Sequence, residues 1–451
     1  MPIIFILAFI LTTVLTFLFA RKKNHSAALI AILSLSLFLK LYCSRDPYLH
    51  QWDERYHALV AKNMITQPLK PTLYQNPVLP YDYKDWTANH IWLSKPPVPL
   101  WFMAGSIAVF GTHEYAVRVP GILFSIASVL LTFLIARKFF DVRIALLAAF
   151  LHGISGIGTD LASGRLSSDG VETCFLFFVE LAMWWIVRTA PGNFKLKHYA
   201  VAGILTGIAV MCKWQPALLC LAIMFVYHWQ RDVVVKHIFY SFLAFLSAAV
   251  VFVPWLVHCF VNFPVETKWL LQSLFSPMTD NGAGHQGTWY SHILNFSNFF
   301  GWGSLLLMIV AIVLFIKSKS RVWLLLLLWA LLPLIIFSFA EMKRGTYLMI
   351  GAPAAFMVVS YFALQMAESF RFARFPIALA WISVVTIVGY SIEKLYLFSD
   401  NKPGTSDWSE TIKNADYSLG TIIYNEVHCI EVMFYHDDVV AYAIAGKDLS
   451  E

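Results

Sequence analysis

Ionisable residues gather in one short stretch of an otherwise apolar chain. The segment LHQWDERYHALVAKNM, residues 49–64, places Asp53 and Glu54 side by side and adds Arg55 and two histidines. Such a carboxylate pair can act as a general base or bind cations, or it can complement the dipole at the start of a helix. The choice depends on the surroundings into which the rest of the chain brings this segment.

The composition indicates those surroundings. Apolar residues make up 59% of the 451 residues and charged residues only 13%, so most of the chain must lie in lipid. A membrane span needs roughly 20 apolar residues, and about twelve runs approach that length. These runs cover residues 2–20, 26–43, 116–137, 143–159, 171–188, 198–212, 216–230, 238–260, 301–316, 322–340, 349–364 and 375–397. We therefore predict an all-α polytopic membrane protein with about twelve transmembrane helices.

Basic residues cluster in alternate short connections, which the positive-inside rule assigns to the cytoplasmic side. The net charge of +6 thus marks membrane orientation and does not indicate nucleic-acid binding. The clusters are Arg21-Lys22-Lys23, Arg137-Lys138 with Arg143, Arg188 with Lys195 and Lys197, Arg231 with Lys236, Lys317-Lys319-Arg321, and Arg371 with Arg374.

The parity of the crossings defines the outer loops. Three apolar stretches separate the inner clusters at Lys23 and Arg137, so one of them does not cross the membrane. The stretch 97–110 is the shortest and begins among prolines, which favours an interfacial or re-entrant helix. Residues 44–115 then form one long outer loop. We interpret residues 2–20 as a helix, since a signal peptide would need a small-residue cleavage site.

The C-terminal tail has a different pattern. GTIIYNEVHCIEVMFYHDDVVAYAI, residues 420–444, predicts a strand, an amphipathic helical turn and a second strand. We predict two units: a membrane domain at residues 1–397 and a small extracytoplasmic α/β appendage at residues 398–451, too small for a core of its own. No P-loop or GxGxxG motif is present, so ATP-driven and nicotinamide-linked mechanisms lack support.

Cations occur in the outer stretches, against the bias that sets the topology. We expect them to bind a ligand, and a phosphate suits Lys and Arg because its oxygens accept charge-assisted hydrogen bonds. We assign substrate binding to Lys95, Arg118, Arg165, Lys213, His285, Lys343, Arg344 and Tyr347, and catalysis to Asp53, Glu54 and Asp169.

Five stretches carry a family resemblance. In order and spacing they resemble bacterial members of the dolichyl-phosphate-mannose protein mannosyltransferase superfamily: WDERYHALVAKNM, KPPVPLWFMAGSIAVFGTHEYAVRVPG, RLSSDG, a lysine after GIAVM, and KRGTYLMIGAP. The chain looks most similar to lipid A aminoarabinose transferases and polyprenyl-phosphate-dependent galacturonosyltransferases. The resemblance implies a GT-C fold whose outer loops enclose a lipid-phosphate-linked sugar. It also implies an inverting transfer with Asp53 as the principal catalytic residue.

The residues themselves lead to a compatible chemistry. A single displacement at a sugar carbon needs one base, unlike the paired carboxylates of a retaining hydrolase, and cations for the leaving phosphate. Asp53 is the candidate base, with Lys95 and Arg118 as cations of the cavity. Lys343 and Arg344 would neutralise the phosphate, with Tyr347 as a hydroxyl donor nearby; otherwise the two cations are anchors that snorkel to the interface.

The other assignments also have structural alternatives. Glu54 either takes part in catalysis or holds the loop, and both acids of the pair could cap the helix that follows. Asp169, shortly after Arg165, is either an active-site acid of the second outer loop or a turn cap or salt-bridge partner. Lys213 either binds substrate or snorkels from a helix end.

Histidines raise the question of a metal. The outer stretches contain His50, His57, His90, His285 and His292, without HxxxH or HExxH spacing. In the aminoarabinose transferases an acidic residue before Lys-Pro-Pro helps to hold a metal, whereas this chain has Ser94 there. The sequence requires no cofactor and gives a divalent metal no support. His285, in a Gly-rich stretch, is either a loop or substrate contact or a metal ligand.

We therefore expect an inverting glycosyltransferase in the cell inner membrane. It would move a sugar from a polyprenyl phosphate to an envelope lipid, glycan or protein, such as lipid A, on the outer face. A secondary transporter would place ionisable residues at mid-membrane and often shows internal repeats. An O-antigen ligase-like enzyme also uses polyprenyl-linked glycans, but it would not explain the Asp-Glu pair in the first outer loop.

Overall fold

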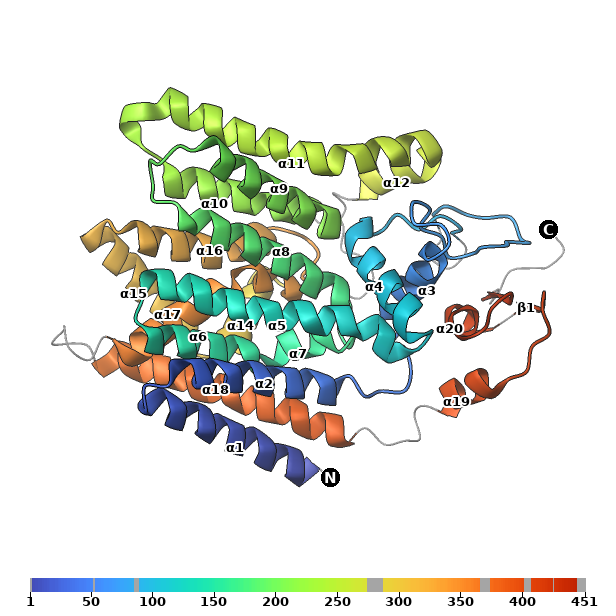
Figure 1. Cartoon of the computed structure of the whole chain (residues 1–451), viewed down its shortest axis with the longest axis horizontal. Coiled ribbons are helices and arrows are strands. Elements are labelled where there is room, and N and C mark those ends of the chain that lie inside the picture. The colour runs from blue at the N-terminus through green and yellow to red at the C-terminus, as the bar shows by residue number, and fades with distance from the viewer. Residues whose placement is uncertain are drawn as a thin grey trace.

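The computed structural model describes residues 2–51, 53–84, 89–273, 287–365, 374–400, 407–424 and 426–443. Long helices lie alongside one another and form the membrane part (Figure 1). Its elements are α1 (Pro2–Arg21), α2 (His25–Cys43), α5 (Glu114–Phe139), α6 (Val142–Gly153), α7 (Gly156–Ala162), α8 (Asp169–Arg188), α9 (Leu196–Lys213), η1 (Gln215–Leu218), α10 (Leu219–His228), η2 (Arg231–Val233), α11 (Val234–Asn262), α14 (Ser291–Phe300), α15 (Ser304–Ser318), α16 (Arg321–Ser338), η3 (Gly345–Gly351), α17 (Ala352–Leu364) and α18 (Arg374–Asp400).

The apolar runs dictate this architecture, because a backbone in lipid must satisfy its own hydrogen bonds and a helix does so within one segment. Among the described residues, seven helices are long and apolar enough to cross a membrane. Two bent pairs, α6–α7 and α14–α15, raise that number to nine. The other predicted spans correspond to α1, α9 and η1–α10. The chain is a multi-pass membrane protein with the all-α architecture predicted from its sequence.

The basic connections between helices lie at one end of the bundle (Figure 1). The described basic connections, α1–α2, α5–α6, α8–α9, α10–α11 and α15–α16, lie at the left end of the view. The predicted sixth cluster includes Arg371, which lies outside the described residues. The opposite end carries α3 (Asp53–Met64), α4 (Pro97–Phe110) and α12 (Pro264–Ser273). Thus α4 stays with the outer loop and does not cross the bundle, as the parity argument predicted.

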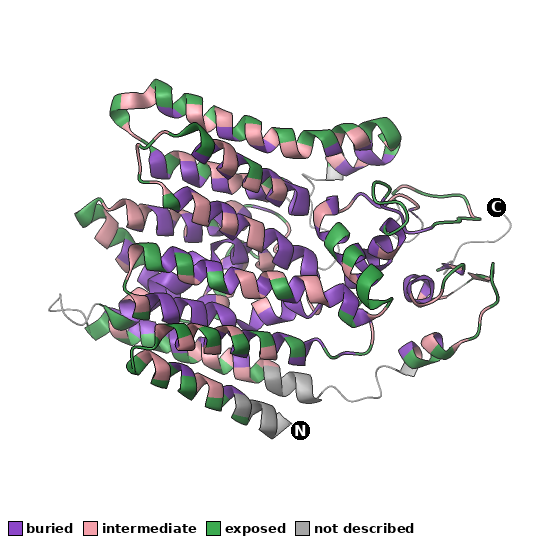
Figure 2. Cartoon of the chain, in the orientation of Figure 1, coloured by how far each residue is buried: buried purple, intermediate pink, exposed green. Residues whose placement is uncertain are grey.

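The exposed surface of the membrane part is apolar. Figure 2 shows exposed residues along α1 and the outer side of α11, and mainly buried residues in the central helices α6 and α8. On α11, Phe242, Val250 and Val257 are 57%, 74% and 54% exposed. Contiguous apolar surface of this size marks a face that contacts lipid.

The C-terminal appendage has the predicted strand–helix–strand order. Strand β1 (Ile422–Tyr424) pairs in parallel with β2 (Val440–Tyr442), and α20 (Cys429–Tyr435) connects them. A further helix, α19 (Asp407–Asn414), precedes them. Buried residues of α20 and α3, including Phe434 and Leu59, belong to one hydrophobic cluster. The appendage therefore shares its core with the segment between α2 and α5, which contains α3.

Candidate active site

Asp53 begins α3 at the end of the bundle opposite the basic connections. Its Oδ2 accepts a hydrogen bond of 2.8 Å from the Ser168 N–H and lies 3.6 Å from Lys95 Nζ. Burial alone would raise the pKa of Asp53, but the charges of Lys95, His57 and Arg344 and the Ser168 N–H hold it well below its usual range. Asp53 is thus an ionised carboxylate that faces cations from several parts of the chain.

Those cations come from segments far apart in sequence. Lys95 lies two residues before the start of α4, and Arg344 lies between α16 and η3. Lys213, the last residue of α9, has its Nζ 4.8 Å from the centre of the Tyr347 ring and interacts electrostatically with Arg344 and Asp53. The structure therefore gathers five of the predicted site residues around one point.

The Arg344 guanidinium keeps free hydrogen-bonding capacity. Its Nε is buried and has no hydrogen-bond partner among the described residues. A buried cationic donor without a partner costs free energy unless a ligand satisfies it. Arg344 is consequently the residue of this group best suited to bind an added anion.

Glu172 is a member of the site that the sequence analysis missed. It is fully buried one turn into α8 and forms an ion pair with Lys213 through Oε2, while its Oε1 has no partner among the described residues. An acid near the end of an apolar helix is itself a signal for function. Pairing with Glu172 also means that Lys213 does not merely snorkel to the interface.

Asp169 is buried and bonded within the protein. It is 1% exposed, and its carboxylate lies 2.8 and 3.0 Å from Nδ1 of His57. His57 follows Asp53 by one turn of α3, so the i, i+4 spacing could have indicated that it lies near the candidate base. The alternative that we left open, a pairing role for Asp169, is therefore the one that its contacts favour.

Glu54 and Arg118 face each other away from Asp53. Arg118 Nε and Nη2 donate to the two Glu54 oxygens at 2.7 and 3.0 Å. The remaining Arg118 donors bind the carbonyl oxygens of Ser44, Asp46 and Tyr48. All N–H groups of Arg118 are therefore occupied. This corrects the expectation that Arg118 offers free donors to a phosphate, and Glu54 holds the loop.

Arg165 extends this loop network. It donates to Oδ2 of Asp46 at 3.0 Å, and Asp46 also contacts His50, which lies 2.6 Å from Glu54. Burial opposes ionisation of Glu54, but Arg118 and His50 lower its pKa to about 2. Because Arg165 is engaged with Asp46, the prediction that it binds substrate needs correction as well.

Lys343 is bonded to the backbone, unlike its neighbour Arg344, whose Nε has no partner among the described residues. Its Nζ donates to the backbone carbonyls of Ser338, at 2.9 Å, and of Ala340. Lysine near a helix end commonly satisfies the last carbonyls of that helix. The expectation that Lys343 and Arg344 bind one phosphate together is thus wrong for Lys343 in this structure.

The remaining expectations concern the histidines. His285 lies outside the described residues. His50 and His57 are both bonded to carboxylates, as above, and His292 is buried. Among the residues that the structure describes, no three His, Cys, Asp or Glu side chains converge as metal ligands.

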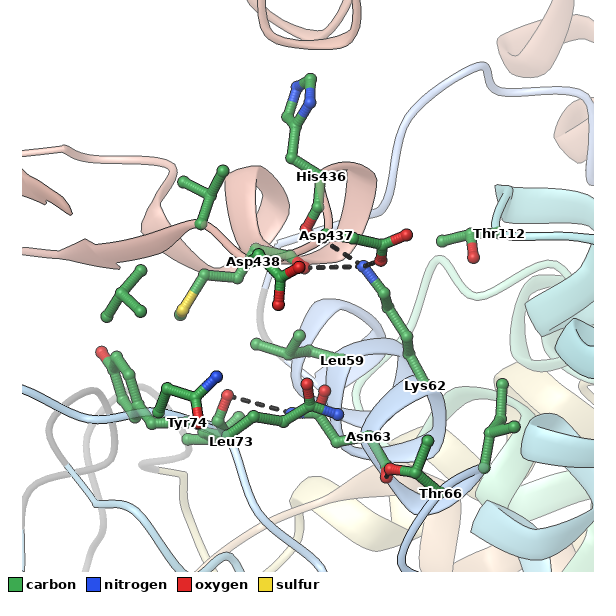
Figure 3. Close-up of a pocket in the computed structure, with 16 residues that line it drawn as sticks. Leu59, Lys62, Asn63, Thr66, Leu73, Tyr74, Thr112, His436, Asp437 and Asp438 are labelled. Carbon is green, nitrogen blue, oxygen red and sulfur yellow. Dashed lines mark hydrogen bonds and ion pairs between the residues drawn. The ribbon is translucent and has the colours of Figure 1, made fainter. Parts of the chain in front are cut away.

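A separate cavity of about 360 Å³ lies between α3 and the appendage (Figure 3). Lys62 points to Asp437 there and donates to carbonyl oxygens at the end of α20, so its charge is satisfied. Nine residues separate Lys62 from Asp53, which places them on opposite faces of α3, about half a turn apart. None of the predicted site residues lines this cavity.

The chain is similar to known membrane transferases. A family model described as dolichyl-phosphate-mannose-protein mannosyltransferase matches residues 94–258. The undecaprenyl phosphate-alpha-4-amino-4-deoxy-L-arabinose arabinosyl transferase 1 of Pseudomonas fluorescens (strain Pf0-1) is 26% identical over 281 residues, which are 59% of this chain and 48% of that protein. The corresponding transferase of Pseudomonas aeruginosa (strain UCBPP-PA14) is 27% identical over 280 residues, 59% of this chain and 49% of that protein. The chain spans about half the length of the curated relatives it matches.

Solved structures extend the likeness over most of the chain. The crystal structure of ArnT from Cupriavidus metallidurans bound to undecaprenyl phosphate has a TM-score of 0.65 at 13% identity, covering 92% of this chain and 84% of that one. This chain has the GT-C fold. The archaeal oligosaccharyltransferase AglB from Archaeoglobus fulgidus shares it, with a TM-score of 0.56 at 13% identity and 94% and 65% coverage.

The family model, the relatives and the solved structures together confirm the resemblance to these membrane transferases that the short motifs predicted. In this fold α3, which begins at Asp53, lies at the end of the bundle opposite the basic connections (Figure 1). The family model's range contains Lys95, Asp169, Glu172 and Lys213, but it stops before Arg344.

Proposed function

We propose that this GT-C protein is an inverting glycosyltransferase that moves a sugar from a polyprenyl phosphate to an envelope acceptor on the outer face of the inner membrane. The proposal rests on one observation: the Asp53 carboxylate lies near Lys95 and interacts electrostatically with Arg344, whose Nε has no partner among the described residues. This group lies at the end of the bundle opposite the basic connections. By the positive-inside rule that end is extracytoplasmic. The relatives named above, which act with an undecaprenyl-phosphate sugar, support the donor class.

Each residue would have a distinct task. An acceptor hydroxyl oxygen forms a bond to the anomeric carbon while the bond from that carbon to the phosphate oxygen breaks. The electron pair leaves with the polyprenyl phosphate, and Lys95 and Arg344 stabilise its charge. The acceptor proton passes to Asp53. A single displacement of this kind inverts the anomeric configuration.

The depressed pKa of Asp53 links donor binding to catalysis. In the free protein Lys95, His57 and Arg344 keep Asp53 ionised, which makes it a weak base. A bound phosphate would neutralise Lys95 and Arg344, and the pKa of Asp53 would then rise toward its usual value. The carboxylate would become a better proton acceptor only when the donor is in place.

A proteoliposome assay tests the proposal. Undecaprenyl phosphate carrying radiolabelled 4-amino-4-deoxy-L-arabinose is supplied with lipid A, and label in lipid A is measured for the wild type and Asp53→Asn. We expect transfer by the wild type alone. Label that crosses the membrane without joining the acceptor would indicate transport, and transfer by the variant would remove Asp53 from the mechanism.

A further inference from the structure

Two consecutive residues at the start of α8 have positive φ angles: Ser168, which precedes the helix, and Asp169, its first residue. Ser168 has a φ of 77° and Asp169 a φ of 35°. For residues other than glycine such conformations cost about 1–3 kcal/mol each, and they persist where surrounding contacts fix them. The contacts that fix this turn lead to α3, which carries Asp53.

Two bonds fasten the turn to the first two turns of α3. The Ser168 N–H donates to Asp53 Oδ2 at 2.8 Å, and Asp169 accepts from Nδ1 of His57 at 2.8 and 3.0 Å. Because an ionised carboxylate only accepts hydrogen bonds, Nδ1 must carry the proton. The strained turn is thus hydrogen-bonded to Asp53, the candidate base, and to His57, one turn further along α3.

Asp169 and His57 have no access to a reacting group. Asp169 is 1% exposed, and its Oδ1 also accepts from the Val171 N–H at 3.0 Å. His57 is fully buried, packs edge-on against Trp92 with ring centres 5.3 Å apart, and leaves Nε2 without a partner among the described residues. The pair can therefore act only through its neighbours.

We propose that His57 and Asp169 are positioning residues, which lock the turn at Ser168 so that its N–H fixes the orientation of the Asp53 carboxylate. The inference rests on the proposed function, in which Asp53 accepts the acceptor proton. Without the lock the turn relaxes to ordinary dihedral angles, the Ser168 N–H leaves Oδ2, and Asp53 turns toward Lys95. The base then no longer lies in line with the acceptor hydroxyl.

The test uses variants that separate the bond from the side chain's bulk. Asp169→Leu and His57→Leu remove the acceptor or the donor, whereas His57→Asn keeps an N–H near the position of Nδ1. Ser168→Gly keeps its backbone N–H and tolerates a positive φ. In the full-length protein, the first two variants should lose roughly 10²-fold in kcat, as misplaced catalytic groups do, with KM for the donor unchanged. The last two should retain turnover.

A second measurement does not depend on turnover. In protein labelled with ¹⁵N-serine and held in lipid nanodiscs, the Ser168 amide proton should be shifted downfield by its bond to Asp53, and Asp53→Asn assigns that resonance. The shift should disappear in Asp169→Leu and His57→Leu and persist in His57→Asn. If one of the two disrupting variants fails to fold, the resonance of the other still tests the positioning role.

The outcomes are distinguishable. An unchanged Ser168 resonance in Asp169→Leu and His57→Leu overturns the positioning role, whatever their turnover. Equal loss of kcat in His57→Asn and His57→Leu overturns it too. A wild-type protein that transfers no sugar, while its variants show the expected resonance changes, refutes the proposed function and keeps the positioning contacts.

Discussion

Asp53 and Glu54 are consecutive residues of α3, yet their carboxylates face two different groups of cations. Glu54 lies in a network with Arg118, His50 and Asp46 in which each charge has close partners. Asp53 faces Lys95 at 3.6 Å and, farther away, Arg344, whose Nε has no partner among the described residues. The two groups therefore differ in how much hydrogen-bonding capacity they leave for a ligand.

The difference between the Glu54 and Asp53 groups shows that a charged residue must be interpreted by its hydrogen-bond partners. A buried ion pair with all its donors bonded fixes a loop, because removing one partner leaves the other charge unpaired. A cation that is incompletely bonded can instead satisfy itself by binding an anion. Composition and spacing mark both kinds of residue alike, whereas the predictions below separate them by changing one member of each group.

The largest effect is expected for Asp53, the candidate base. Asp53→Asn keeps the shape of the side chain and cannot accept a proton, so transfer should fall by about 10²–10⁴ while donor binding persists. Turnover with the radiolabelled donor and thermal unfolding are the measurements. Wild-type turnover in the purified variant would make Asp53 a helix cap and remove the contrast with Glu54.

The second effect concerns stability. Glu54→Gln leaves the Arg118 charge buried without a counter-ion, which should cost about 3–5 kcal/mol of unfolding free energy. Chemical denaturation in mild detergent, followed by tryptophan fluorescence, measures it. Asp53→Asn is the control and should change stability less, because the Lys95 and Asp53 side chains are 12% and 24% exposed whereas those of Arg118 and Glu54 are both 1% exposed. Similar losses in both variants would show that the two carboxylates have the same role.

Acid should affect the Glu54 network in a defined range. The pKa of Glu54 is lowered from 4.5 to about 2 in the folded protein, so its contribution to stability is complete above about pH 4.5 and disappears as the pH falls toward 2. Wild-type protein should lose stability across that range, whereas Glu54→Gln should show a weaker dependence. Identical acid curves would contradict the ion pair.

The third effect separates two neighbouring cations. Arg344→Ala should weaken the binding of undecaprenyl phosphate by roughly 1.5–3 kcal/mol, because it removes hydrogen bonds to a charged group. Lys343→Ala is the control and should leave binding unchanged, since Lys343 donates to carbonyls at the end of α16. Titration with the phosphate and with neutral undecaprenol measures the difference. Equal losses of phosphate binding in Arg344→Ala and Lys343→Ala would show that both residues bind the phosphate.

The smallest effect is expected at the far face of α3. Lys62→Met removes hydrogen bonds to the end of α20 and should cost about 1 kcal/mol of stability. Transfer should stay at the wild-type level, because Lys62 lies on the face opposite Asp53. Increased proteolysis of residues 407–443 would report the loosened appendage. A loss of transfer without such loosening would connect the cavity of Figure 3 with catalysis.

The sequence determined the parts of this protein that depend on local pattern. Apolar runs predicted the helices, the alternating basic connections predicted which ends share a side, and the short stretch 97–110 was correctly kept out of the crossings. The tail's β-branched residues predicted the pair of strands with a helix between them. These features follow from periodicity and from the cost of charge and backbone in lipid, which neighbouring residues determine.

Only the tertiary structure decided which ionisable residues remain available. Arg118 binds carbonyl oxygens some 70 positions earlier in the chain, and Glu172 meets Lys213 from another helix. Lys343 donates to carbonyl oxygens, whereas Nε of the adjacent Arg344 has no partner among the described residues. A side chain's hydrogen-bond partners depend on which segments pack beside it, and no spacing in the sequence records that. The residues that could bind a phosphate were therefore visible in the sequence as candidates, and the packing of distant segments determined which of them kept unsatisfied donors.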